Sequence, residues 1–173
     1  MEGKDGAITN RELVELNKML AAMDDGRGTV KLDYGLSRIK IQAEDALRAF
    51  ENATAPSKVI KGFMAKREQI RQGFLQMDQQ GRPVTVSTKE GPFKPTGDEA
   101  GFRDAVEEYL DENPDIRTAV EKYNERYNEL LNEQLVISFY KIKGEYITDG
   151  ALPRKLLRVL MRYDAIAGEP GGE

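Results

Sequence analysis

The sequence predicts an α+β fold that is mainly α-helical. Apolar residues recur every three or four positions over most of the chain, which is typical of amphipathic helices. Segments rich in Gly and Pro separate these stretches, and only two short runs, 84–87 and 135–142, are rich in strand-forming residues. We therefore expect an N-terminal helical hairpin with a long kinked arm, followed by further helices and a small antiparallel β-sheet.

The first helix is predicted over residues 10–24. Thr9 is placed to cap its N-terminus, Glu12 is the partner expected in a capping box, and Ile8 and Leu13 form a hydrophobic staple. The segment 24–28, Asp-Asp-Gly-Arg-Gly, ends the helix. One apolar stripe follows the helical period and contains Leu13, Leu16, Leu20 and Met23.

A second helix is expected to begin near Asp33, which makes a hairpin with the first. The helical apolar spacing continues to Met77, but Pro56 lies within it. Proline has no backbone N–H and restrains the residue before it, so the sequence predicts a kink or, more strongly, a break at Pro56. The apolar residues beyond this point include Ile60, Phe63, Ile70 and Phe74.

The second half of the chain is predicted to hold three further helices and the sheet. Thr96 and Glu99 fit a second capping box, and Pro114 fits the first turn of the next helix. The best strand, 135–142, is expected to turn into a second short strand at 146–147, with the 84–87 segment as a third partner. A last helix follows Pro153.

We expect the chain to form a single domain with two parts and a tail. Residues 1–78 make the helical hairpin and arm, and residues 79–166 make the α+β part packed with it. Residues 167–173 are rich in Gly and are expected to be a flexible tail.

Composition excludes many kinds of catalysis. The 173 residues contain no Cys, His or Trp, and 26 Lys and Arg against 30 Asp and Glu give a net charge of −4. Without His or Cys there is no Ser-His-Asp triad, thiol nucleophile or imidazole ligand for zinc. Nucleotide-binding glycine motifs are also missing. We therefore expect a protein that is not an enzyme and needs no cofactor or metal.

No segment has the apolar length of a signal peptide or membrane span, so no membrane partner is expected. The host cytoplasm, or association with a virion, is the expected location.

Charge is unevenly distributed. Residues 98–133 contain 12 acidic and 4 basic residues, a balance of −8, whereas 58–71 and 154–162 each balance to +4. The favoured interpretation of the basic segments is that they face the acidic helices within the fold or on a partner protein, and nucleic acid is not expected as a partner. The acidic face is expected to be solvated. A carboxylate metal site there would use Asp104, Glu107, Glu108 and Asp111.

Ser37 and Lys40 match the Ser-x-x-Lys pattern of penicillin-recognising enzymes. The companion Ser-Asp-Asn and Lys-Thr-Gly motifs are absent, so Ser37 is interpreted as an ordinary helix residue.

Four stretches together resemble a family of small uncharacterised bacteriophage and prophage proteins from Gram-positive hosts. These stretches are 8–13 (ITNREL), 30–36 (VKLDYGL), 127–133 (YNELLNE) and the closing region 141–160. Members of that family lie among structural, assembly or lysis genes and have no assigned reaction. The resemblance therefore implies a role in the phage cycle but no catalytic residues.

The leading functional hypothesis is a non-enzymatic phage or prophage accessory protein that acts through protein contacts in virion assembly. The partner would be a second copy of the chain, another phage protein, or both, because the leading helices carry more apolar surface than one chain is expected to cover. The alternatives are a host-directed inhibitor that imitates nucleic acid and a carboxylate metal-dependent enzyme. The residues expected to bind the partner are Leu13, Leu16, Leu20, Met23, Ile60, Phe63, Ile70 and Phe74.

Overall fold

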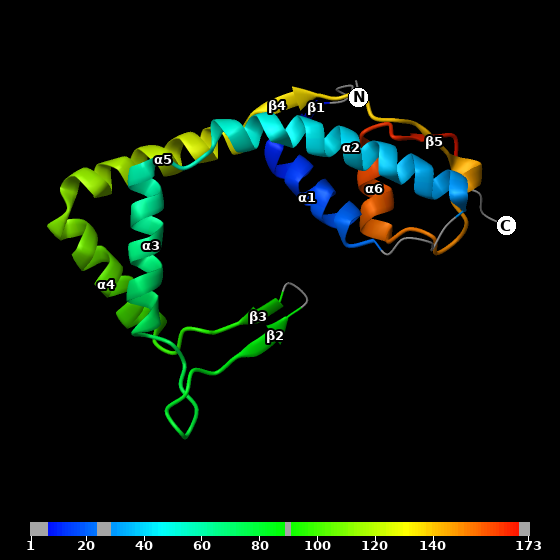
Figure 1. Cartoon of the computed structure of the whole chain (residues 1–173). Coiled ribbons are helices and arrows are strands. Elements are labelled where there is room, and N and C mark those ends of the chain that lie inside the picture. The colour runs from blue at the N-terminus through cyan, green and yellow to red at the C-terminus, as the bar shows by residue number, and fades with distance from the viewer. Residues whose placement is uncertain (1–6, 24–28, 89–90, 170–173) are drawn as a thin grey trace. The chain divides into compact units, whose positions relative to one another are not determined.

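The computed structural model describes residues 7–23, 29–88 and 91–169, and they fall into two compact units (Figure 1). Unit 1 combines Met1–Ala55 with Tyr127–Glu173, and unit 2 is Pro56–Arg126. The expected boundary at residue 78 does not coincide with this division. The chain leaves unit 1 at Pro56 and returns to it within one continuous helix, so unit 2 is an insertion rather than the second half of the chain.

The described residues are mainly helical, as predicted. The helices are α1 (Asn10–Ala21), α2 (Val30–Ala53), α3 (Lys58–Gln72), α4 (Glu99–Glu112), α5 (Pro114–Asn132) and α6 (Arg154–Arg162), with a short 3₁₀ turn η1 (Gly144–Tyr146). The strands are β1 (Ala7–Thr9), β2 (Val86–Thr88), β3 (Gly91–Phe93), β4 (Gln134–Val136), β5 (Ile142–Lys143) and β6 (Ile166–Ala167).

The strands form three separate pairs, so the predicted strands do not join into a single sheet. The pairs β1–β4 and β2–β3 are antiparallel, and β5–β6 is parallel. The predicted strand at 146–147 is replaced by the 3₁₀ turn, and the 84–87 segment pairs within its own hairpin.

Residues 135–142 do not form one strand because a side chain takes the place of a strand partner at their centre. Gln42 Nε2 donates to Ser138 O at 3.0 Å, and Tyr140 N donates to Gln42 Oε1 at 2.7 Å. The segment therefore lies along α2 in extended form, and the ladders with β1 and β6 are confined to its two ends.

The predicted N-terminus of α1 is confirmed. Thr9 N donates to Glu12 Oε2 at 3.0 Å and Glu12 N donates to Thr9 Oγ1 at 3.2 Å, the reciprocal bonds of a capping box. Burial acts to raise the pKa of Glu12, but these hydrogen bonds, with Tyr163 and Arg162 nearby, hold that pKa below its usual value.

The second predicted capping box is wrong. Asp98 caps α4 by accepting from Gly101 N at 2.8 Å, whereas Thr96 forms a β-bridge with Leu75. Pro114 does occupy the first position of α5, as predicted.

The break at Pro56 is confirmed. Helix α2 ends at Ala53, and α3 begins at Lys58 with Ser57 as its cap, so the expected kinked arm is two helices. Helix α2 begins three residues before Asp33 because Thr29 caps it and accepts from Leu32 N at 3.2 Å.

The core of unit 1 joins segments from both ends of the sequence. Nineteen buried hydrophobic side chains form one cluster, and they come from β1, α1, α2, α6, the segment between α5 and α6, and the residues that follow α6. Asn10 ties α1 to the end of α5, since its Nδ2 donates to Leu130 O at 2.8 Å and its backbone N donates to Glu133 O at 3.2 Å. These bonds satisfy carbonyls that a helix end leaves without partners.

The first residue of the predicted C-terminal tail, Ala167, belongs to a strand. Ile166 is buried and pairs with Ile142, and Ala167 pairs with Lys143, so the predicted tail begins inside a strand. Residues 170–173 of that tail lie outside the described residues.

Tyr163, at the end of α6, is a buried tyrosine in this core. Its hydroxyl has no hydrogen-bond partner among the described residues. Burial, with the neighbouring Glu12 carboxylate, raises the pKa of Tyr163 to about 12. The phenol is therefore neutral over the physiological range.

Gly35 allows α2 to approach β5 closely. A Cβ atom at this position would lie 2.6 Å from Ile142 Cγ1, a distance that side chains do not adopt. We predict that Gly35→Ala lowers the free energy of unfolding by about 1 kcal/mol, since an overpacking cost of ~2 kcal/mol is partly offset by a helix-propensity gain of up to ~1 kcal/mol. Urea unfolding followed by circular dichroism measures this change.

Gly62→Ala is the matched control, because a Cβ at Gly62 in α3 meets nothing within 4 Å. That variant should gain about 0.5–1 kcal/mol from helix propensity. A Gly35→Ala protein as stable as the Gly62→Ala protein would contradict the close approach.

Candidate functional site

Unit 2 buries little apolar surface. Among its described residues, four hydrophobic side chains are buried and five large ones are exposed, whereas unit 1 has nineteen buried and seven exposed. The buried four are Ile60, Leu75, Phe102 and Leu110. The exposed five are Val59, Met64, Met77, Val86 and Phe93. Small cores give marginal stability, so unit 2 has less hydrophobic stabilisation of its own than unit 1.

The helices of unit 2 meet through aromatic side chains. Phe63 of α3 stacks on Tyr109 of α4, with ring centroids 6.5 Å apart, and Phe74 lies 6.2 Å from Phe102. Lys66 lies 5.7 Å above the Tyr109 ring, and Arg67 lies over Phe102. These contacts cover one side of α3.

The residues predicted to bind a partner are divided between the two units. Leu13, Leu16 and Leu20 are 0%, 0% and 6% exposed in the core of unit 1, so they offer no surface to a partner in this structure. The first helix was expected to have spare apolar surface because its second neighbour, α6, could not be placed from the sequence. Met23 is half-buried against the same core.

The other four predicted residues lie in unit 2. Ile60 is 3% exposed, and Phe63, Ile70 and Phe74 are half-buried, with the rings of Phe63 and Phe74 against those of α4. Their role in binding a partner stays a prediction.

The β2–β3 hairpin carries apolar surface that sequence reasoning missed. Val86 and Phe93 are cross-strand neighbours on one face and are 46% and 51% exposed. The base of the hairpin is fixed by backbone bonds, including Val84 N to Gln76 O at 2.8 Å and Gly97 N to Phe74 O at 2.7 Å. The alternation of Val and Thr or Ser over 84–87 is the signal from which this apolar face could have been predicted.

Two of the four carboxylates proposed for a metal site, Glu107 and Asp111, pair with an arginine. Arg117 Nη2 lies 3.1 Å from Glu107 Oε2 and 2.7 Å from Asp111 Oδ1, and the hydrogen bond with Glu107, followed by the charge of Asp111, raises the pKa of Arg117. Asp104 lies 3.7 Å from Arg103. No group of three acidic side chains able to hold a metal ion occurs in the described ranges. The geometry therefore does not favour a cation site.

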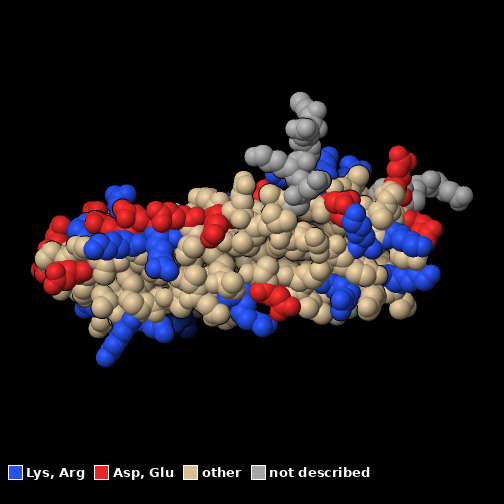
Figure 2. All heavy atoms as spheres, turned by 90° about the horizontal axis from the view of Figure 1, so that it is seen from above, with Lys and Arg blue, Asp and Glu red and all other residues tan. Residues whose placement is uncertain are grey.

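The remaining acidic residues include a regular row on α5. Glu121, Glu125 and Glu129 are exposed and four positions apart, which places them about 6 Å apart along one helix face. None of the three forms an ion pair with another described residue. Figure 2 shows acidic side chains gathered in the region of α4 and α5.

The favoured interpretation holds for one of the two basic segments. In α3, Lys66 lies over the ring of Tyr109 and Arg67 over that of Phe102, so this segment packs on the acidic helix α4, whereas the segment in α6 does not. In α3, Arg71 pairs with Glu68 of the same helix at 2.7 Å and donates to Lys94 O at 2.8 Å. In α6, Arg162 lies 2.9 Å from Glu12 and Lys155 lies 3.8 Å from Glu15, so that helix pairs with α1.

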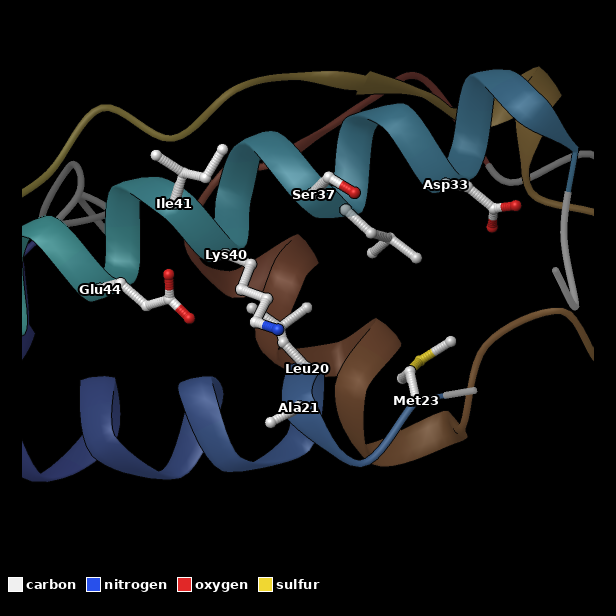
Figure 3. Close-up of a pocket in the computed structure, with 9 residues that line it drawn as sticks. Leu20, Ala21, Met23, Asp33, Ser37, Lys40, Ile41 and Glu44 are labelled. Carbon is white, nitrogen blue, oxygen red and sulfur yellow. The ribbon is translucent and has the colours of Figure 1, made fainter. Parts of the chain in front are cut away.

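Unit 1 contains a groove of about 430 Å³ between α1 and α2. Its apolar lining includes Leu20 and Met23, and Ser37 and Lys40 of the Ser-x-x-Lys pattern both line it (Figure 3). Lys40 extends toward Leu20 in this view, and Ser37 lies one turn before it on α2. In the described part of the chain no hydrogen bond joins Ser37 to Lys40, so the geometry of an activated serine is not formed here.

Comparison with protein-family models, curated proteins and solved structures finds no match to this chain. None of the described helices is long and apolar enough to cross a membrane.

Proposed function

We propose that this chain is a non-enzymatic phage or prophage accessory protein that acts through protein contacts in virion assembly. The observation that carries the proposal is the exposed apolar surface of unit 2. Among its described residues, the exposed large hydrophobic side chains outnumber the buried hydrophobic side chains. Exposed apolar surface on a small unit supports a binding role. The assembly setting follows from the sequence stretches that resemble phage proteins.

The hairpin is the part of this surface best suited to a partner. Val86 and Phe93 lie side by side on one face, and a two-stranded hairpin is marginally stable unless a helix or further strand packs on it. A partner that covers this face would stabilise the hairpin and bury both side chains at once.

We predict that Val86→Asp with Phe93→Asp lowers the yield of infectious particles and leaves the fold intact. Both side chains are exposed in the isolated chain, and a partner would have to bury two carboxylates. In the phage or prophage that encodes the chain, the measurement is the yield of infectious particles, with electron microscopy of incomplete ones. We expect a loss of at least about tenfold, the cost of one buried unpaired group.

Thr85→Asp with Ser87→Asp is the matched control, since these two exposed residues flank Val86 and Ser87 lies on the opposite face of β2. It adds the same charge and should leave particle yield within about twofold. Normal yield from the Val86 and Phe93 variant, with normal circular dichroism of both proteins, would reject the proposed contact.

The acidic row on α5 favours a second candidate, an inhibitor that imitates nucleic acid. Glu121, Glu125 and Glu129 present evenly spaced negative charge on one exposed helix face, as the phosphates of a strand do. Competition with duplex DNA for a host DNA-binding enzyme separates this candidate from virion assembly. Competition that survives changing all three residues to Gln would exclude it.

A further inference from the structure

We propose that the outward face of α6 docks onto the outward face of α5 in a second copy of this chain. The inference rests on the proposed function, since it names one partner of a protein that works through protein contacts. It is drawn from two matching rows of opposite charge.

The basic row lies on α6. Arg154, Arg158 and Arg162 are four positions apart, and positions with this spacing stay within about 80° of one helix face over ~12 Å. All three are exposed, and Leu156 and Leu160, on the opposite side, are buried in the core of unit 1.

Two of these arginines have no partner in the described residues. Arg162 pairs with Glu12, but Arg154 and Arg158 form no hydrogen bond or ion pair with the described parts of the chain. By contrast, Lys66, Arg67 and Arg71 of the other basic segment are engaged within unit 2. Within the described residues, α6 thus presents two arginines that are free to pair with a partner, while the corresponding residues of α3 are two lysines, Lys58 and Lys61.

The acidic row on α5 has the same spacing. Glu121, Glu125 and Glu129 span the same eight residues, ~12 Å, as Arg154 to Arg162. Two helices laid side by side would therefore bring three carboxylates opposite three guanidinium groups. Arginine favours such contacts because its planar group binds a carboxylate through two hydrogen bonds.

An apolar residue on α6 adds to this face. Met161 is 52% exposed and lies one turn from Arg158 on the outward side of the helix. A partner helix would cover its flexible side chain together with the methylene stems of the arginines. The contact would be weak and salt-dependent, because exposed ion pairs are screened by salt.

A second copy satisfies both rows at once. If α6 of each copy binds α5 of the other about a two-fold axis, the contact occurs twice and the dimer closes. Without such an axis, the same contact would produce larger assemblies.

The test is sedimentation equilibrium of the full chain at 50 and 500 mM NaCl with two charge-reversed variants. We expect wild-type self-association at low salt to weaken at least tenfold at high salt. Arg154→Glu with Arg158→Glu, and Glu121→Lys with Glu125→Lys, should each weaken it at least tenfold, and an equimolar mixture of the two variants should recover association between unlike chains.

Matched controls carry equal charge changes elsewhere. Lys58→Glu with Lys61→Glu changes exposed residues of α3, and Glu108→Lys with Glu112→Lys changes exposed residues of α4. Both should associate within about threefold of wild type. Circular dichroism checks folding, and Gln replaces Glu or Lys in any variant that fails to fold.

A wild-type monomer at low salt would overturn the inference, as would a mixture that fails to recover association. Binding of a fluorescent DNA duplex through Arg154 and Arg158, in a chain that does not self-associate, would assign the basic row to nucleic acid instead. Self-association that is unchanged by salt and by every charge-reversed variant would overturn the α5–α6 contact. It would remain consistent with the proposed function through protein contacts.

Discussion

The structure depends on an uneven division of apolar burial between its two units. Nineteen buried hydrophobic side chains hold unit 1 together, and four hold unit 2. Hydrophobic burial is the main favourable term in folding, so the two units differ in how much of their stability they supply themselves. The features that suggest function are the hairpin face and the acidic and basic rows, and the side chains that form them are exposed rather than part of either core.

The way unit 1 is closed explains why it is the stable part. Its core combines α1 and α2 from the start of the chain with α6 and extended segments from the end. Asn10 fixes α1 to the carbonyl end of α5, and Gln42 fixes the extended segment to α2. Unit 2 is inserted in the sequence between these two parts, and none of its buried side chains belongs to the core cluster of unit 1.

Local signals in the sequence predicted the helices well and the long-range pairings poorly. The cap at Thr9, the break at Pro56 and the first position of α5 at Pro114 each depend on a few neighbouring residues, and all three are confirmed. The predicted pairing of the strands differs from the structure because no short-range signal in the sequence shows that Gln42 would replace a strand partner.

The candidate site was only partly predictable for the same reason. The stripe from Leu13 to Leu20 was correctly placed on one helix face, but its cover, α6, lies more than a hundred residues away in sequence. Val86 was visible as a strand residue, yet its pairing with Phe93, which makes one exposed apolar face, depends on the turn between them. The charge balance of the sequence segments did reveal the acidic and basic character of α5 and α6, although not which charges would lack partners.

Amide hydrogen exchange measured by mass spectrometry tests the central claim most directly. Protection reports the free energy of local opening, so a unit with few buried apolar contacts should exchange sooner. The account predicts protection of α3 and α4 at least about tenfold lower than that of α1 and α2 in the isolated chain. Equal protection in the two units would show that unit 2 is stable on its own and would contradict the account.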